Sequence, residues 1–190
     1  MPPASKFDRA DLIGYLRILD ARLTRPGTLR LIGGAVVGLC YLPEYRTRDV
    51  DFAWADREVE AAIQELRLER PDLVVTSQTG VYFAPYSHEE RLRALDIPGL
   101  TRLTVEVPER HDLAIMKVAR GLDRDLEALV QIHAIDPFDP GTLVERFHET
   151  WLTGPQRLAD LGLLALIETL FGAAEADRAE RRLETLRQAR

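Results

Sequence analysis

The spacing of apolar side chains predicts a mixture of helices and strands over the first 107 residues. A helix over 7–23 is predicted because leucines recur at helical spacing, at positions 12, 16, 19 and 23. A Gly-Gly pair at 33–34 separates a strand at 28–32 from a helix at 35–42, and a second strand follows at 49–54. The other elements predicted here are a helix at 56–69, which Asp56 is placed to cap, and strands at 73–76, 80–84, 91–95 and 102–107.

Beyond Pro108 the pattern is helical, with helices expected at 109–120, 123–135, 141–151, 155–171 and 174–188. The helix at 155–171 carries leucines on nearly every side. We therefore expect it either to be sandwiched inside the chain or to be covered by a partner, which includes self-association. The whole pattern predicts an α/β (α+β) fold, with a mixed sheet and flanking helices in a core at 1–107. A helical portion at 108–190 is expected to pack on that core.

The composition narrows the class of protein. A hydrophobic content of 46% and a charged content of 29% are ordinary for a globular chain. No run approaches the roughly 18 apolar residues of a membrane helix, and the N-terminus lacks a signal pattern, so no membrane partner is expected. The single cysteine, Cys40, excludes an internal disulfide and suits a cytoplasmic protein. A net charge of −6 argues against broad non-specific binding of nucleic acid.

The candidate chemistry lies in the stretch from the Gly-Gly pair to "TRDVDF" at 47–52. Gly33 and Gly34 at a strand-to-helix turn would let a phosphate approach the backbone, and the helix N-terminus would offer it free N–H groups. Asp49 and Asp51 are two residues apart, so on a strand both side chains point to the same face. Carboxylate and phosphate oxygens are the ligands that Mg²⁺ prefers. The stretch therefore predicts a site for Mg²⁺ and a nucleoside triphosphate.

Two arginines come just before this pair of acids. Arg46 and Arg48 are placed to neutralise phosphate charge and are candidate nucleotide-binding residues. Other kinds of site are not indicated. The four histidines lack metal-ligand spacing, and "GGAVVG" has neither the ending of a Walker loop nor the glycine spacing of a dinucleotide-binding motif.

These motifs resemble the signature of the nucleotidyltransferase superfamily, whose members share the DNA polymerase β catalytic core. The closer resemblance is to bacterial abortive-infection nucleotidyltransferases, the toxin halves of type IV toxin–antitoxin pairs. Their second recurring element is a helix with a central lysine and an Asp-rich turn, and "HDLAIMKVARGLDRDLE" at 111–127 is similar to it. The resemblance covers about 28–135. It implies that Lys117 contacts the triphosphate, and its pattern also includes Asp112 and Asp125.

The resemblance further implies a third metal-binding carboxylate from a later strand. Glu106 is the first candidate, because it alternates away from the apolar residues of its strand, and Asp96 is the second. The catalytic and metal-binding set expected is thus Asp49, Asp51 and Glu106.

These motifs lead to two hypotheses about the function, which belong to different classes. The first is a Mg²⁺-dependent nucleotidyltransferase that moves a nucleoside monophosphate from a triphosphate to an acceptor hydroxyl on RNA, protein or a small molecule. Such an enzyme could be a toxin with an antitoxin partner. The alternative is a catalytically degenerate fold that binds a nucleotide or a protein. A weaker third alternative is an interaction module that works through the helix at 155–171.

Overall fold

The structure is a computed structural model of the 190-residue chain and describes residues 6–70, 75–78, 84–118, 123–150 and 156–189. The chain forms two compact units. Unit 1 comprises Met1–Tyr82 and Leu92–Pro108, and unit 2 comprises Phe83–Arg91 and Glu109–Arg190. The strand predicted at 80–84 lies outside the described residues, apart from its last position.

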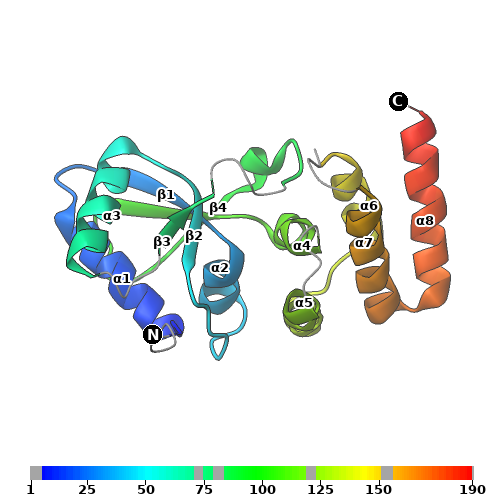
Figure 1. The fold of residues 1–190 in the computed structure, drawn as a ribbon, viewed down its shortest axis with the longest axis horizontal. Helices are drawn as coiled ribbons and strands as arrows, with labels where there is room; N and C mark the ends of the chain where they lie inside the picture. The colour runs from blue at the N-terminus through cyan, green and yellow to red at the C-terminus, as the bar shows by residue number, and fades with distance from the viewer. Residues whose placement is uncertain (1–5, 71–74, 79–83, 119–122, 151–155, 190) are drawn as a thin grey trace. The chain divides into compact units, whose positions relative to one another are not determined.

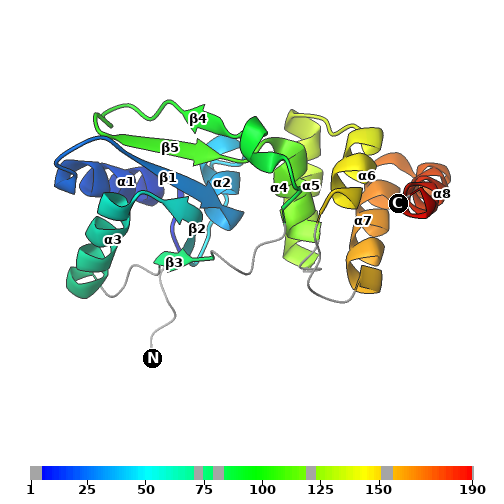
Figure 2. The ribbon, with the colours of Figure 1, turned by 90° about the horizontal axis from the view of Figure 1, so that it is seen from above.

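Unit 1 is built around a mixed five-stranded sheet (Figure 1; Figure 2). Its strands are β1 (Gly27–Ile32), β2 (Val50–Ala55), β3 (Val75–Ser77), β4 (Arg93–Leu95) and β5 (Leu103–Val107). They lie in the order β3-β2-β1-β5-β4, and β1 is antiparallel to β2 but parallel to β5. The helices are α1 (Arg9–Arg22), α2 (Gly33–Cys40) and α3 (Arg57–Glu69). The α+β mixed sheet expected from the sequence is confirmed.

The two faces of this sheet differ in burial. Alternate residues of β1 and β5 are buried, Leu29, Leu31 and Val105 to 1% exposure or less, and this face packs against helices. A Cβ on Gly27, which shares that face, would lie 2.7 Å from Cγ2 of Val59 on α3. The intervening residues are polar and partly exposed. We call this second side, which carries Thr28, Arg30, Thr104 and Glu106, the open face.

Asp20 fastens α1 to the beginning of β5. The side chain lies in the last turn of the helix and is 5% exposed. Its Oδ1 accepts hydrogen bonds from the backbone N–H groups of Thr101, Arg102 and Leu103 at 2.9, 2.7 and 2.7 Å, and Oδ2 accepts one from the Thr101 hydroxyl at 3.1 Å. One carboxylate therefore satisfies three backbone donors at the start of the strand that carries Glu106.

We expect acid to weaken unit 1 through Asp20. Burial raises the pKa of this carboxyl, but the N–H donors lower it further, and its net pKa lies below the usual value. The stabilising effect of such a group is fully present above its unfolded pKa and is lost as the pH falls through the lower folded pKa. Urea unfolding followed by circular dichroism should therefore show wild-type stability falling below about pH 4.

The matched variant is Asp20→Asn, which keeps one acceptor oxygen but cannot ionise. It should cost about 1–3 kcal/mol at pH 7, because hydrogen bonds to a charged acceptor become bonds to a neutral one. Its stability should also depend less steeply on pH in the acid range. A variant as acid-sensitive as the wild type would contradict this account.

Unit 2 is helical. It contains a 3-10 helix, η1 (His88–Arg91), followed by α4 (Arg110–Val118), α5 (Asp123–Ile135), α6 (Pro140–His148), α7 (Gln156–Phe171) and α8 (Ala173–Gln188). Helix α7 contacts α4, α5, α6 and α8 and buries Leu163, Leu166 and Ile167 completely. Leu158 and Leu161 remain 65% and 54% exposed, so α7 is covered on one side only by the described part of its own unit.

Most predicted elements are present with small shifts of their ends. The largest shift that bears on the site is in α2, which begins at Gly33 instead of residue 35 and ends at Cys40. Asp56 does occupy the N-cap of α3, but its Oδ2 accepts a hydrogen bond from the backbone N–H of Thr28 at 2.8 Å and makes no capping bond to the helix. No helix among the described residues is long and apolar enough to cross a bilayer.

Candidate active site

Both glycines at the start of α2 are required by close approaches. Gly33 has a φ of +68°, a conformation that side-chain-bearing residues rarely adopt, and a Cβ there would lie 3.1 Å from Oδ2 of Asp51. A Cβ on Gly34 would lie 2.5 Å from Oγ1 of Thr47. The absence of side chains therefore lets Asp51 and Thr47 lie directly against the first turn of α2.

The N-terminus of α2 has the character of an anion site. Its N-cap is Ile32, which has no side-chain hydrogen bond to offer, and the first turn carries no acidic residue. The N–H groups of a first helical turn have no partner within the helix, and together they form the positive end of the helix dipole. This end of α2 can therefore receive a phosphate group.

A β-bulge turns Asp51 toward the open face. The pairing of β1 with β2 runs from Arg30 opposite Trp54 to Leu31 opposite Phe52, which leaves Ala53 as the extra residue. Without the bulge, Asp51 and Trp54 would point to opposite faces, since they are three residues apart. With it, Asp51 lies opposite Ile32, on the same face as Arg30 and Trp54.

The two aspartates are held by neighbouring polar groups. Asp51 is 7% exposed, and its Oδ1 accepts a hydrogen bond from Nε2 of Gln78 at 3.2 Å. Asp49 lies one residue before β2, and Oγ1 of Thr47 is 2.9 Å from its carbonyl oxygen and 3.2 Å from its Oδ1. Asp51 thus lies against Gly33, and Asp49 is linked through Thr47 to Gly34.

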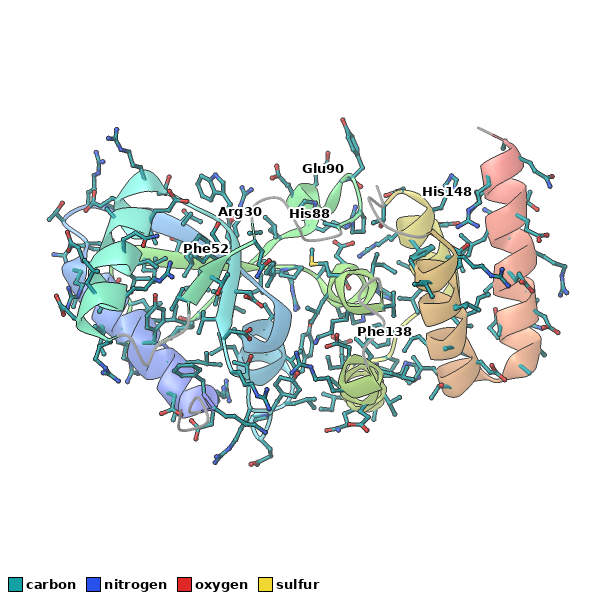
Figure 3. All side chains as sticks on the ribbon, viewed as in Figure 1. Arg30, Phe52, His88, Glu90, Phe138 and His148 are labelled. Atoms are coloured by element: carbon teal, nitrogen blue, oxygen red, sulfur yellow. The ribbon has the colours of Figure 1, made fainter. Side chains whose placement is uncertain are left out.

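Glu106 lies on the open face but is bound to another residue. Nε of Arg30 donates a hydrogen bond to its Oε2 at 2.8 Å (Arg30 is labelled in Figure 3). Strand β1 separates β5 from β2, and Glu106 pairs with Arg30 whereas Asp51 pairs with Ile32. Strands β5 and β2 are two strand spacings apart, and Arg30 and Ile32 are two residues apart along β1. The Cα atoms of Glu106 and Asp51 are therefore roughly 12 Å apart.

In the part of the chain that the structure describes, no third carboxylate joins Asp49 and Asp51. Within the described residues, no three histidine, cysteine, aspartate or glutamate side chains are close enough to hold a metal ion together. Asp96 follows β4 at the far edge of the sheet, with β5 and β1 between it and β2. The role of Glu106 as third ligand stays a prediction, and it requires the carboxylate to leave Arg30.

Arg46 and Arg48 flank Thr47 and are both exposed. Thr47 itself is fixed by a backbone bridge to Phe7. Nη2 of Arg46 lies 4.0 Å from Oδ2 of Asp8, with its side chain 62% exposed, so this ion pair is weak. Their role in binding a nucleotide remains a prediction.

Lys117 lies in the interior of unit 2. Its side chain is 1% exposed, and its Nζ donates to Oδ1 of Asp125 at 2.6 Å, whose side chain is 2% exposed. Asp125 is the third residue of α5 and therefore lies inside the helix, not at its cap. The ion pair holds α4 to α5, and contact between Lys117 and a triphosphate would require Nζ to move away from Asp125.

Asp112 is the centre of a second buried network in unit 2. Arg91 donates to both of its carboxylate oxygens at 2.9 and 3.0 Å, and Arg146 contacts Oδ1 at 3.2 Å. Arg146 also binds Glu109. Burial raises the pKa of Glu109, but His111 and Arg146 lower it further, to about 2. The network fastens α4 to η1 and α6, which gives Asp112 a structural role in this unit.

Sequence reasoning missed four residues of the site: Thr47, Gln78, Arg30 and Trp54. Thr47 could have been found, since a hydroxyl two residues before an aspartate commonly binds it locally. Gln78 could not, because its contact depends on the parallel pairing of β2 with β3. Arg30 and Trp54 depend in the same way on the register of β1 with its neighbours.

One family model matches residues 12–158, and the family is described as a nucleotidyltransferase of unknown function (DUF6036). The matched range contains the glycine turn, both aspartates, Glu106 and Lys117. Comparison with curated proteins gives no match, and comparison with solved structures gives none. The match spans well over half of the chain, so the protein belongs to this family of nucleotidyltransferases of unknown function and, with it, to the nucleotidyltransferase superfamily.

Proposed function

We propose that the protein is an active Mg²⁺-dependent nucleotidyltransferase that moves a nucleoside monophosphate from a triphosphate to an acceptor hydroxyl. One observation carries this proposal. Asp51 lies directly against Gly33, and Asp49 is joined through Thr47 to the position of Gly34, at the uncapped N-terminus of α2. Two carboxylates and an anion-binding backbone therefore meet at one turn.

The donor set suits Mg²⁺. This ion commonly takes one or two protein carboxylates and completes its shell with water and substrate phosphates. Asp49 and Asp51 would supply those carboxylates, and Glu106 would add a third if Arg30 released it. When bound, the ion would neutralise charge on the phosphate oxygens.

Backbone and side-chain groups of the protein would bind the phosphates, orient the aspartates and accept the proton. The N–H groups of the first turn of α2 would bind the terminal phosphates, and Arg46 and Arg48 would supply positive charge. Thr47 orients Asp49, and Gln78 orients Asp51. A carboxylate held in this way can accept the proton of the acceptor hydroxyl as it attacks the α-phosphate.

The alternative is a degenerate fold that binds a nucleotide or a protein without transfer. The pairing of Glu106 with Arg30 favours it, because that pairing keeps the third carboxylate away from the aspartates. A cytoplasmic toxin with an antitoxin partner is a narrower form of the first proposal. The exposed Leu158 and Leu161 of α7 offer a surface on which an antitoxin or a second copy could bind.

Incubation with Mg²⁺, each labelled nucleoside triphosphate and separate pools of RNA, protein and small molecules tests the proposal. The wild type should label one pool, and Asp49→Ala/Asp51→Ala should not. If the wild type labels no pool above the level of this double variant, the protein is not an active transferase. Triphosphate binding without transfer would then support the degenerate fold.

A further inference from the structure

The open face of unit 1 presents an exposed aromatic ring beside the site. Trp54 is the exposed residue of β2, at 40% relative exposure. Cζ of Arg30 lies 4.7 Å from the centroid of its ring, within the range of a cation–π contact. Glu106 binds Nε of the same arginine and so fixes the guanidinium in place. The indole, with the guanidinium over one of its faces, forms a preorganised stacking surface.

The position of this surface follows from the strand register. Along β1, Arg30 comes first, opposite Trp54, and Ile32 follows, opposite Asp51. The glycine turn begins at the next residue, Gly33. Asp51 therefore lies between the phosphate-binding turn on one side and the Arg30–Trp54 surface on the other. Because of the bulge, the step from Trp54 to Asp51 matches the two-residue step from Arg30 to Ile32, which is about 7 Å along the strand.

The chemistry of transfer determines what would bind on that second side. The acceptor oxygen forms a bond to the α-phosphorus as the bond to the bridging oxygen of the β-phosphate breaks, and pyrophosphate leaves with that electron pair. The hydroxyl proton passes to a carboxylate of the aspartate pair. Because entering and leaving oxygens are in line, an acceptor must approach from the side opposite to the glycine turn, which is the side of Arg30 and Trp54.

We propose that Trp54 and Arg30 stack the terminal base of a single-stranded RNA, whose ribose hydroxyl is the acceptor. Unpaired bases are typically bound by aromatic rings and guanidinium planes. The net charge of −6 disfavours a long track of phosphate contacts, so a local stacking contact at the RNA end fits this chain better. The inference rests on the proposed function, since that function places the phosphates at the glycine turn.

Trp54 can report on this contact directly. The chain has two tryptophans, so Trp151→Phe leaves Trp54 as the single indole. A short unstructured oligoribonucleotide with a free 3′ hydroxyl, added without Mg²⁺ or triphosphate, should quench its fluorescence. In the full chain, Trp54→Ala should weaken binding of the same labelled oligonucleotide about ten- to hundredfold, as measured by anisotropy. Trp54→Phe keeps an aromatic ring, so its affinity for the oligonucleotide should fall by less.

Tyr86→Ala is the matched control, because Tyr86 is an aromatic residue 91% exposed in unit 2. It should leave oligonucleotide binding unchanged. The proposal is overturned if the wild type does not bind the oligonucleotide, if Trp54→Ala binds it as the wild type does, or if only a triphosphate quenches Trp54. In the last case the surface serves the incoming nucleotide.

Calorimetry with Mg²⁺ and a triphosphate separates this inference from the function on which it rests. Trp54→Ala should bind the triphosphate like the wild type. If the wild type binds no triphosphate but still binds RNA through Trp54, the proposed transferase fails and the stacking subsite remains. If the wild type binds the triphosphate but does not bind RNA, the stacking subsite fails and the proposed transferase remains.

Discussion

Replacement of Asp51 by asparagine should lower nucleotidyl transfer by about 10²–10³-fold and leave the fold intact. Asparagine has the shape of aspartate, and its carbonyl oxygen can still accept the hydrogen bond from Gln78. It lacks the negative charge that a hard cation requires, so the charge stabilisation supplied at the phosphates is lost. Steady-state transfer of a labelled nucleotide, at equal protein concentration and matched circular dichroism, measures the effect.

The control is Glu60→Gln, which removes one negative charge from the exposed surface of α3. It should transfer at the wild-type rate. Asp49→Asn should resemble Asp51→Asn, since both aspartates are expected to bind the metal. If Asp51→Asn keeps most of the activity, the reaction centre lies elsewhere in the chain.

Replacement of Lys117 by methionine should destabilise unit 2 by about 3–5 kcal/mol. Its partner Asp125 is 2% exposed, so removal of the ammonium group takes from a buried carboxylate the cation that it binds at 2.6 Å. Such a loss is a large part of the stability of an ordinary domain. Urea unfolding, combined with hydrogen exchange of the α4 and α5 amides, would show whether the loss is confined to this unit.

The double variant Lys117→Met/Asp125→Leu should recover most of that stability, because both charges of the buried pair are removed. Arg187→Met is the comparison for an exposed pair, since Arg187 binds Asp160 with side chains 37% and 21% exposed. It should cost no more than about 1 kcal/mol. A stable double variant that still binds triphosphate would make Lys117 structural. Loss of binding in that variant would support the nucleotide contact implied by the family pattern.

The local part of the site was predictable because its residues are close in sequence. The Gly-Gly pair and the two aspartates lie within 33–51. A strand at 49–54 would place Asp49 and Asp51 on one face, although β2 begins one residue after Asp49. The sequence predicts the start of α2 two residues late, because a Gly-Gly pair is typical of a turn that precedes a helix. In the structure, Gly33 adopts its left-handed conformation as the first residue of α2.

The remaining contacts depend on strand order and register, which a single sequence does not specify. Alternation in β5 correctly placed Glu106 away from the apolar face. Its partner Arg30 lies 76 residues earlier and meets it only because β1 and β5 are parallel neighbours. The bulge at Ala53, which brings Asp51 and Trp54 to one face, has no signal in the sequence. The burial of Lys117 against Asp125 likewise depends on how α4 packs on α5.

The most direct test of the account is a crystal structure of the protein with Mg²⁺ and a triphosphate analogue that cannot be cleaved between its α- and β-phosphates. We predict a metal ion bound by Asp49 and Asp51, with the terminal phosphates on the N–H groups of Gly33 and Gly34. An analogue bound away from the glycine turn, or bound there with no metal on the two aspartates, would contradict the account.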